Sequence, residues 1–337
     1  MKFATCRSDG PPRVGVVLDD RVHPIPDVAD MLDLVRAGLP AALRAGERAL
    51  ADGPALPLAG LSLQAPLKPA SIRDFVAFEE HVEGVRRSVE GLSGVPDAWY
   101  DAPTFYFTNP HTVVGTGADV VCPVATRALD FELEVAVVVG AGGRNLDADR
   151  ARDHVFGYLV MNDWSARDLQ RREMQVNLGP AKGKDFATTL GPWLTTADEL
   201  APYRDSDGFL DLRCTVSVNG NQVGSDLLSN MGWTFETMIA YASRDSTVAA
   251  GDVLGSGTVG HGGCLSELWG RRGVQEPPPL VPGDEVSMTV EALGTISNRV
   301  AVGPAAPALP GVRRRDVAAA RSASRLLPRP LIVTGPA

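Results

Sequence analysis

The stretch Leu129–Gly140, with the sequence LDFELEVAVVVG, decides how the rest of the chain is interpreted. Its second half, residues 135–139, is a continuous apolar run that is typical of a buried strand. In its first half apolar and acidic residues alternate, so Asp130, Glu132 and Glu134 fall on one face of the expected strand. An unpaired carboxylate is costly to bury, so each of these acids needs a cation or must take up a proton.

Two interpretations of this acidic face remain open from the stretch alone. A hard divalent metal ion prefers carboxylate oxygens and would neutralise the three acids together. Alternatively, the stretch is an edge strand whose acidic face is solvated.

Composition excludes several classes of function. The chain has 337 residues, of which 44% are hydrophobic and 22% charged, and its formal net charge is −9. The acidic balance argues against nucleic acid or an anionic membrane as a partner, while an anionic small molecule stays compatible with a site that has its own cations. No stretch has the length and apolarity of a membrane span or the pattern of a signal peptide. Four cysteines without a CxxC or disulfide spacing favour a reducing cytoplasm: Cys6, Cys122, Cys214 and Cys264.

Residues 1–70 are predicted to form a small N-terminal α/β module. We expect strands at 2–6, 13–18 and 21–25, a helix over 27–53 that is interrupted near 38–40, and a Pro- and Ala-rich linker over 53–70.

Residues 71–302 are predicted to form the main domain, and residues 303–337 a weakly ordered extension with a candidate strand at 331–333. We expect a strand pair at 113–114 and 120–122, further strands at 157–161, 191–196 and 212–218, and helices at 149–155, from Asn162 or Asp163, and at 234–243. Asn219-Gly220 between two strands predicts a hairpin. Many short strands and few helices indicate a β-rich α+β fold.

Asp163 follows an apolar strand at the expected start of a helix. If that helix continues, Asp163, Arg167 and Gln170 lie on one face, and Asp163 can complete a metal site with Glu132 and Glu134. The alternative is a helix-capping aspartate that pairs with Arg167 on a solvated helix.

The other candidates carry weaker signals by themselves. Lys184 lies in the loop GPAKGKD, whose glycines suit close approach to a ligand, although the loop is not a Walker motif and Lys182 fits as well. His81 is one of five histidines, and His154 and His261 are equally plausible from composition. Glu267 follows a glycine-rich stretch and is ambiguous.

Taken together, four stretches in this order resemble the fumarylacetoacetate hydrolase (FAH) superfamily over residues 71–300. They are LDFELEVAVVVG, MNDWSARDLQ, LGPAKGKDFATTLGPW, and GSGTVG followed by LSEL. The resemblance implies a mixed β-roll catalytic domain with a smaller N-terminal domain, a homodimer, and one divalent cation, with Mg²⁺ favoured over Mn²⁺ or Ca²⁺.

The resemblance also implies roles for individual residues. The metal carboxylates correspond to Glu132, Glu134, Asp163 and, in some members, Asp74. His81 corresponds to the catalytic base and Glu267 to the acid that orients it. Groups that hold the substrate and its oxyanion correspond to Arg167, Gln170 and Lys184, and neighbouring positions to Tyr106, Asn109, Thr188 and Thr258.

The chain departs from the family pattern in the substrate half of the site. Val76 replaces a tyrosine of the fumarylacetoacetases, and Thr108 and Asn109 replace a basic residue of acylpyruvate-cleaving relatives. These changes leave the identity of the substrate undetermined.

The expected activity is a metal-dependent hydrolysis of a carbon–carbon bond in a β-diketo acid or acylpyruvate, of the kind found in aromatic catabolism. His81, oriented by Glu267, would activate water, and the metal would stabilise the departing enolate. The first alternative is an isomerase, hydratase or decarboxylase that uses the same metal enolate. The second alternative is a non-catalytic, metal-dependent binding protein.

Overall fold

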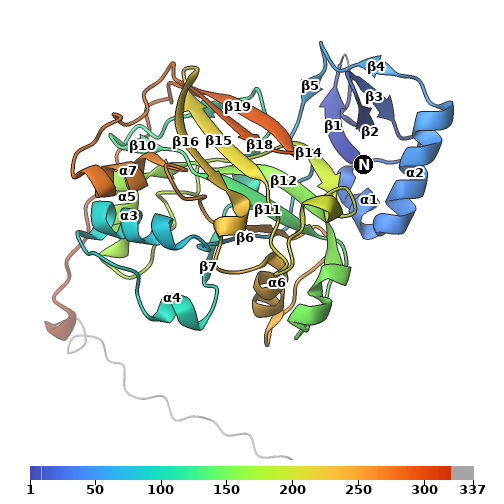
Figure 1. The fold of residues 1–337 in the computed structure, drawn as a ribbon. Helices are drawn as coiled ribbons and strands as arrows, with labels where there is room; N and C mark the ends of the chain where they lie inside the picture. Colours follow the sequence, from blue (N-terminus) through green and yellow to red (C-terminus); the bar gives the residue numbers. More distant parts are fainter. Residues whose placement is uncertain (9, 320–337) are drawn as a thin grey trace, which may run out of the picture. The chain divides into compact units, whose positions relative to one another are not determined.

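The computed structural model describes residues 1–8 and 10–319 (Figure 1). The chain divides into two units, Met1–Gly303 and Pro304–Ala337. In the second unit the described residues, 304–319, are all exposed, and the candidate strand at 331–333 lies outside the described residues.

The N-terminal residues form strands and helices close to the predicted ones: β1 (Lys2–Arg7), β2 (Arg13–Leu18), β3 (Arg21–Pro24), α1 (Met31–Arg36), α2 (Leu39–Asp52), β4 (Leu56–Pro57) and β5 (Ser62–Leu63). The first helix begins four residues later than predicted, because the Asp30 side chain accepts a hydrogen bond from the Asp33 amide (3.0 Å) and caps it. Gly38, with φ 85°, separates α1 from α2. The predicted linker over 53–70 contains two short strands, β4 and β5.

A twelve-stranded, mainly antiparallel sheet forms the centre of the first unit. Its order is β4-β3-β2-β1-β14-β12-β11-β17-β6-β7, while β5 pairs with β1 and β8 with β14. Strand β1 pairs with β14 and so joins the strands of residues 1–70 to this sheet. Whether residues 1–70 fold as a module by themselves stays a prediction. The further strands are β6 (Ile72–Phe75), β7 (Phe105–Thr108), β8 (Val113–Val114), β11 (Leu133–Val139), β12 (Val155–Asp163), β14 (Thr188–Thr196) and β17 (Val253–Gly255).

A second sheet of five strands has the order β16-β15-β18-β19-β9, and a short pair is formed by β10 and β13. The bounds are β9 (Asp119–Val121), β10 (Leu129–Asp130), β13 (Ser165–Ala166), β15 (Arg213–Val218), β16 (Asn221–Leu227), β18 (Glu285–Val290) and β19 (Gly294–Ala301). The prediction that 113–114 pairs with 120–122 is wrong, because β8 pairs with β14 in the large sheet and β9 with β19 in the small one. The Asn219-Gly220 hairpin is confirmed, and both residues have the positive φ that this turn needs.

The helices of the main region are α3 (Glu79–Glu90), α4 (Ala98–Asp101), α5 (Arg167–Met174), α6 (Phe235–Ser243) and α7 (Leu265–Arg272), with 3-10 turns η1 (Pro110–Thr112), η2 (Ala148–His154), η3 (Ala201–Tyr203) and η4 (Leu228–Asn230). The predicted short helix at 149–155 is the 3-10 turn η2, and Val155 already belongs to β12. None of the helices among the described residues is long and apolar enough to cross a bilayer. The predicted strand-rich α+β fold is confirmed.

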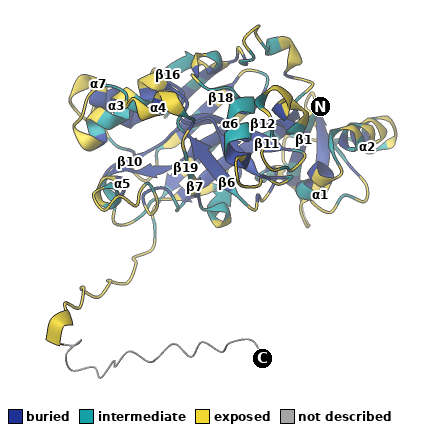
Figure 2. Ribbon diagram, turned by 90° about the horizontal axis from the view of Figure 1, so that it is seen from below, coloured by how far each residue is buried: buried dark blue, intermediate teal, exposed yellow. Residues whose placement is uncertain are grey.

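Strand β11 lies at the centre of the core, which explains its apolar run. All seven of its residues are buried. Val135, Val137 and Val139 pack in one hydrophobic cluster, and Ala136 and Val138 pack in another on the opposite face. Figure 2 shows β11 and β12 in the dark blue of buried residues.

Helices α3 and α7 pack unusually closely through two glycines. A Cβ at Gly270 would lie 1.9 Å from the carbonyl oxygen of Gly84, and a Cβ at Gly84 would lie 2.5 Å from Glu267 Cγ. Only glycine permits this approach. The packing brings α7, which carries Glu267, against α3, which carries His81.

Candidate active site

The acidic stretch is interrupted between Asp130, which ends β10, and Leu133, which begins β11. Asp130 does not join Glu132 and Glu134 in one cluster of carboxylates, although Arg167 Nη2 contacts both Asp130 and Glu132. Its carboxylate accepts hydrogen bonds from Arg167 (2.8 Å) and from the amides of Leu265 (2.8 Å) and Ser266 (2.9 Å). The alternative of a solvated edge strand is wrong, because Asp130, Glu132 and Glu134 are at most 2% exposed.

Four buried carboxylates converge at the end of the large sheet. Asp74, Glu132, Glu134 and Asp163 each offer an oxygen, and these oxygens lie within 4.8 Å of one another. They come from β6, the residue before β11, β11 itself and the end of β12, which the strand pairing brings together. The predicted metal carboxylates are therefore neighbours in space. We call these four residues the buried acidic group.

Asp163 does not cap a helix. It is the last residue of β12, and the chain stays extended through β13, so that α5 begins at Arg167 with Ala166 as its N-cap. Arg167 and Gln170 both lie on α5 and are buried, which overturns the alternative of a solvated helix.

Two buried cations contact the buried acidic group. Lys184 donates hydrogen bonds to Glu132 and Asp163, and Arg167 Nη2 lies 2.7 Å from Glu132 Oε1 and 2.8 Å from Asp130 Oδ2. Burial opposes ionisation of Glu132, but Lys184 and Arg167 outweigh it and hold its pKa below the ordinary value. The structure thus places Lys184 in the site, whereas the Lys182 side chain is 77% exposed.

The remaining carboxylates lack enough positive charge. Within the described residues, Asp74 Oδ1, Glu134 Oε1 and Asp163 Oδ1 are buried without a hydrogen-bond partner. Burial raises the pKa of Glu134 well above its ordinary value, and Asp74 and Glu132 raise it further. Burial also raises the pKa of Asp163, although Lys184 partly offsets this. Three orphaned oxygens on hard ligands, close together and short of charge, fit a divalent cation.

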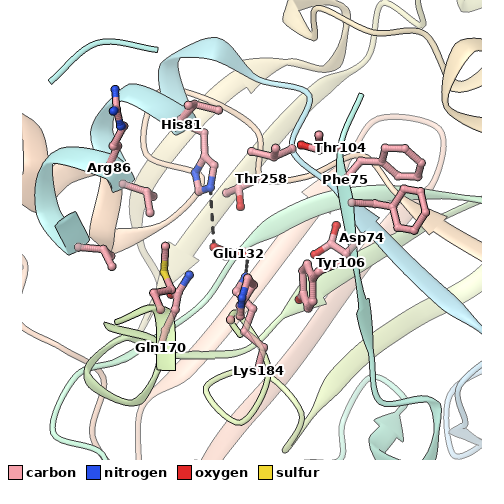
Figure 3. Close-up of a pocket in the computed structure, with 18 of the residues that line it drawn as sticks. Asp74, Phe75, His81, Arg86, Thr104, Tyr106, Glu132, Gln170, Lys184 and Thr258 are labelled. Carbon is pink, nitrogen blue, oxygen red and sulfur yellow. Dashed lines mark hydrogen bonds and ion pairs between the residues drawn. The ribbon is translucent and has the colours of Figure 1, made fainter. Parts of the chain in front are cut away.

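His81 faces this group from α3. Its side chain is 8% exposed, and Nε2 lies 3.8 Å from Glu132 Oε1. A dashed line marks this contact in Figure 3. Burial lowers the pKa of His81 to about 3, so the ring is neutral near neutral pH and can accept a proton. The other ring nitrogen, Nδ1, lies 3.6 Å from Cys264 Sγ.

Glu267 is close to His81 in the fold but has other partners. Its Oε1 accepts hydrogen bonds from the Gly262 amide (3.3 Å) and pairs with Arg271 Nη2 (3.0 Å). No hydrogen bond joins Glu267 to His81 in the part of the chain that the structure describes. Cys264 contacts both residues, because the Sγ that lies near His81 Nδ1 also accepts a hydrogen bond from the Glu267 backbone amide (3.3 Å) and caps α7. Sequence reasoning missed Cys264, for which the position three residues before Glu267 is the available signal.

The other predicted site residues divide between the cavity and its surroundings. Tyr106 donates a hydrogen bond to Asp163 Oδ2 (2.5 Å), and Gln170 Oε1 accepts one from Arg167 Nη1 (3.1 Å). Thr258 lines the cavity, and the hydroxyls of Thr258 and Thr188 are buried without a partner among the described residues. Asn109 is not among the lining residues. Its side chain donates to the Asp185 carbonyl (3.1 Å) and caps η1.

A cavity of about 550 Å³ opens onto this site. Its polar end is lined by His81, Lys184, Gln170 and Tyr106 and by three of the four clustered carboxylates, Asp74, Glu132 and Glu134. Figure 3 labels all of these except Glu134. This volume lies in the range typical of small-molecule sites. The arrangement can hold a cation, neutralise anionic oxygens and transfer a proton.

Comparison with known proteins shows the family to which the chain is similar. Residues 70–301 match the family described as fumarylacetoacetate (FAA) hydrolase, C-terminal. The fumarylacetoacetase of Bos taurus is 31% identical over 282 residues, covering 67% of this chain and 67% of that protein. Oxaloacetate tautomerase YisK of Bacillus subtilis (strain 168) is 34% identical over 201 residues, covering 59% of this chain and 61% of that protein. These matches thus span about three fifths to two thirds of the length of the two relatives.

A solved structure has the same fold. The fumarylacetoacetate hydrolase from Exiguobacterium antarcticum superposes with a TM-score of 0.71 at 25% identity, covering 90% of this chain and 100% of that one. The FAH-type fold implied by the resemblance is confirmed.

Proposed function

Because the chain belongs to the fumarylacetoacetate hydrolase family, we propose that it is a divalent-metal-dependent hydrolase that cleaves a carbon–carbon bond in an acylpyruvate or another β-diketo acid. One observation carries the proposal: a buried, neutral His81 faces four clustered carboxylates that are short of positive charge. We propose that Asp74, Glu132, Glu134 and Asp163 hold one divalent ion, with Mg²⁺ favoured over Mn²⁺ or Ca²⁺. When bound, this ion would supply Lewis-acid stabilisation of the substrate oxygens.

His81 is the proposed general base. It takes a proton from water as the water oxygen bonds to the acyl carbonyl carbon. The bond from that carbon to the neighbouring methylene then breaks, and its electron pair passes to the methylene carbon of the leaving enolate. The protonated His81 returns its proton to that carbon, so that one carboxylic acid and pyruvate result. Positioned proton transfer of this kind is typically worth about 10²–10⁴-fold in rate.

Lys184, Arg167 and Gln170 are the proposed anion-stabilising residues. Lys184 has three N–H donors and uses two of them on Glu132 and Asp163, which leaves one for a substrate oxygen. Gln170 accepts from Arg167 through its oxygen, and its amide NH₂ group, which has no partner among the described residues, can donate to the substrate. Such preorganised donors usually supply the largest share of stabilisation for a developing oxyanion.

Product analysis tests the reaction type. Metal-free protein is reloaded with Mg²⁺ or Mn²⁺ and incubated with a panel of 2,4-dioxo acids in water enriched in heavy oxygen. Hydrolysis places the heavy oxygen in the released acyl carboxylate and forms pyruvate. A product with a moved double bond, released carbon dioxide or no cleavage would contradict the proposal.

A second candidate is a tautomerase or isomerase of an oxo acid. The observation that favours it is that His81 Nδ1 lies against Cys264 rather than against Glu267, so no carboxylate among the described residues pairs with this ring nitrogen. Proton transfer alone needs less of such a partner than activation of water does. Exchange of substrate carbon-bound hydrogen with solvent, without cleavage, is the outcome that would support this candidate.

A further inference from the structure

The outer part of the cavity has a different chemistry from its polar end. Helix α3 presents Val82, Val85 and Val89 to the cavity, at a spacing of three and four residues that places them on one face. The wall is continued by apolar side chains from the segment before α4, from α4, from the end of α5 and from the loop after α5: Pro96, Trp99, Met174 and Pro180. Trp99 is fixed in this wall, because its Nε1 donates to the Val76 carbonyl (2.6 Å).

The apolar wall begins next to His81, the proposed base. His81 and Val85 are four residues apart on α3 and so lie on the same side of the helix. Val89 is one further turn away, on the order of 12 Å along the axis from His81 at the usual helical rise. A group attached to the carbonyl carbon that faces His81 can therefore extend along these valines.

The basic side chains that line the cavity are already committed to other partners. They are Arg86, Arg167 and Lys184. Arg167 and Lys184 contact the buried acidic carboxylates, as described above. Arg86 Nη1 donates to the carbonyls of Ser93 (3.2 Å) and Gly94 (3.0 Å), and its Nε lies 3.5 Å from Glu90. Figure 3 shows the Arg86 side chain directed away from Glu132 and Lys184. Arg167 and Lys184 thus serve the polar end, and Glu90 already balances the charge of Arg86, so none of the lining cations lacks a counterion at the outer end.

We infer that the preferred substrate is an acylpyruvate whose acyl group is uncharged and apolar, such as a branched alkyl or aryl group, rather than one that ends in a carboxylate. This inference rests on the proposed function. Transfer of an apolar group from water to the valine and tryptophan wall is favourable, whereas a carboxylate there would lose its hydration without gaining a counterion.

A matched pair of substrates tests this inference. The two acylpyruvates carry a 3-methylbutyl or a 2-carboxyethyl group, which have the same shape and differ in charge. We expect kcat/KM to be at least about tenfold higher for the 3-methylbutyl compound, since a carboxylate without a partner costs more than 1.4 kcal/mol. An equal value, or a preference for the carboxyethyl compound, would overturn the inference while leaving the hydrolase proposal in place. If neither compound nor acetylpyruvate is cleaved, the hydrolase proposal itself fails.

Charge substitution on the wall provides a second test. Val85→Arg adds a free cation to the apolar face, and we expect the ratio of the two kcat/KM values to shift toward the carboxyethyl compound by about tenfold or more. The ratio cancels any loss of folded or active enzyme that both substrates share. The control is Val274→Arg, the same change at a residue that is 60% exposed and does not line the cavity, and it should leave the ratio unchanged. An unchanged ratio in Val85→Arg would overturn the placement of the acyl group along α3.

Discussion

Two groups of acidic residues lie near α3, and they differ in burial and in how their charge is balanced. In the buried acidic group, Lys184 and Arg167 contact only part of the carboxylate oxygens, and three oxygens have no partner among the described residues. In the second group, which we call the exposed group because Glu80 and His261 are exposed, His261 Nδ1 lies 2.6 Å from Glu80 Oε2 and 3.4 Å from Oδ2 of Asp226, whose side chain is only 8% exposed. Arg271 Nη2 also lies 3.9 Å from Glu80.

The comparison separates acidic clusters that need a cation from those that do not. The side chains of Glu80 and His261 are 45% and 51% exposed, so water and the neighbouring basic groups can balance the charge. Burial removes that option from Asp74, Glu134 and Asp163. We therefore expect metal dependence to follow the buried group alone.

The largest effect is expected from Glu134→Gln. Glutamine keeps the shape of the side chain and its contact with the Gly257 amide (3.2 Å) but removes one charge that a cation needs. We expect turnover to fall by about 10³-fold or more, in line with the several kcal/mol that a Lewis-acid ion supplies. The matched control, Glu80→Gln in the exposed group, should stay within about twofold of the wild type. Equal losses of turnover in both variants would contradict the claim that only the buried acidic group needs a cation.

Removal of Lys184 should cost stability. Lys184→Met leaves Glu132 and Asp163 without their shared cation, and we expect metal-free protein to lose about 3–5 kcal/mol of unfolding free energy. Lys182→Met removes only an exposed pair with Asp185 (3.0 Å) and should cost less than about 1 kcal/mol. Urea denaturation of both variants measures the difference. If the two costs are alike, Lys184 is not the compensating charge.

The pKa of Glu267 predicts how the stability of the protein depends on pH. Glu267 pairs with Arg271, which also contacts the exposed group. Burial raises the pKa of Glu267 from the ordinary 4.5 to about 7, so the folded state holds its proton more tightly than the unfolded state does. This residue therefore makes the protein less stable as pH rises from about 4.5 to 7, by up to about 3 kcal/mol.

Glu267→Gln should remove that contribution. Its unfolding free energy relative to the wild type should be higher at pH of about 8 than at about 5, by an amount of this order. The other carboxylates are common to both proteins and cancel in the difference. A difference that does not depend on pH would show that Glu267 is ionised in the folded protein throughout this range.

The smallest effect is expected at Cys264. If its Sγ fixes the His81 ring, Cys264→Ser keeps a polar contact and should lower kcat by no more than about tenfold, while Cys264→Ala removes it and should lower kcat further with KM little changed. A loss of stability with unchanged kcat in both variants would assign Cys264 a structural role only.

Much of this site could be predicted from the sequence because its signals are local. The alternation before β11 and the apolar run within it gave the strand, and the order of four motifs gave the family. The pairing of Asp130 with Arg167 could not be predicted, since it joins residues 37 positions apart in the sequence. The break between β10 and β11 was missed as well, because no residue in LDFELEV signals it. Helix α3 was not predicted from the sequence, because its buried face packs against α7 and lines the cavity rather than packing on a continuous core. The close contact of Gly84 with Gly270 could not be predicted either, because the spacing of residues along the sequence does not indicate which helices pack together.

Calorimetric titration of Mn²⁺ into protein stripped of metal by a chelator tests the central claim most directly. The account predicts one ion bound per chain in the wild type and in Glu80→Gln, and affinity weakened by at least about a hundredfold in Glu134→Gln, because one of the hard, charged ligands is lost. Binding that Glu134→Gln leaves intact, or that Glu80→Gln abolishes, would contradict it.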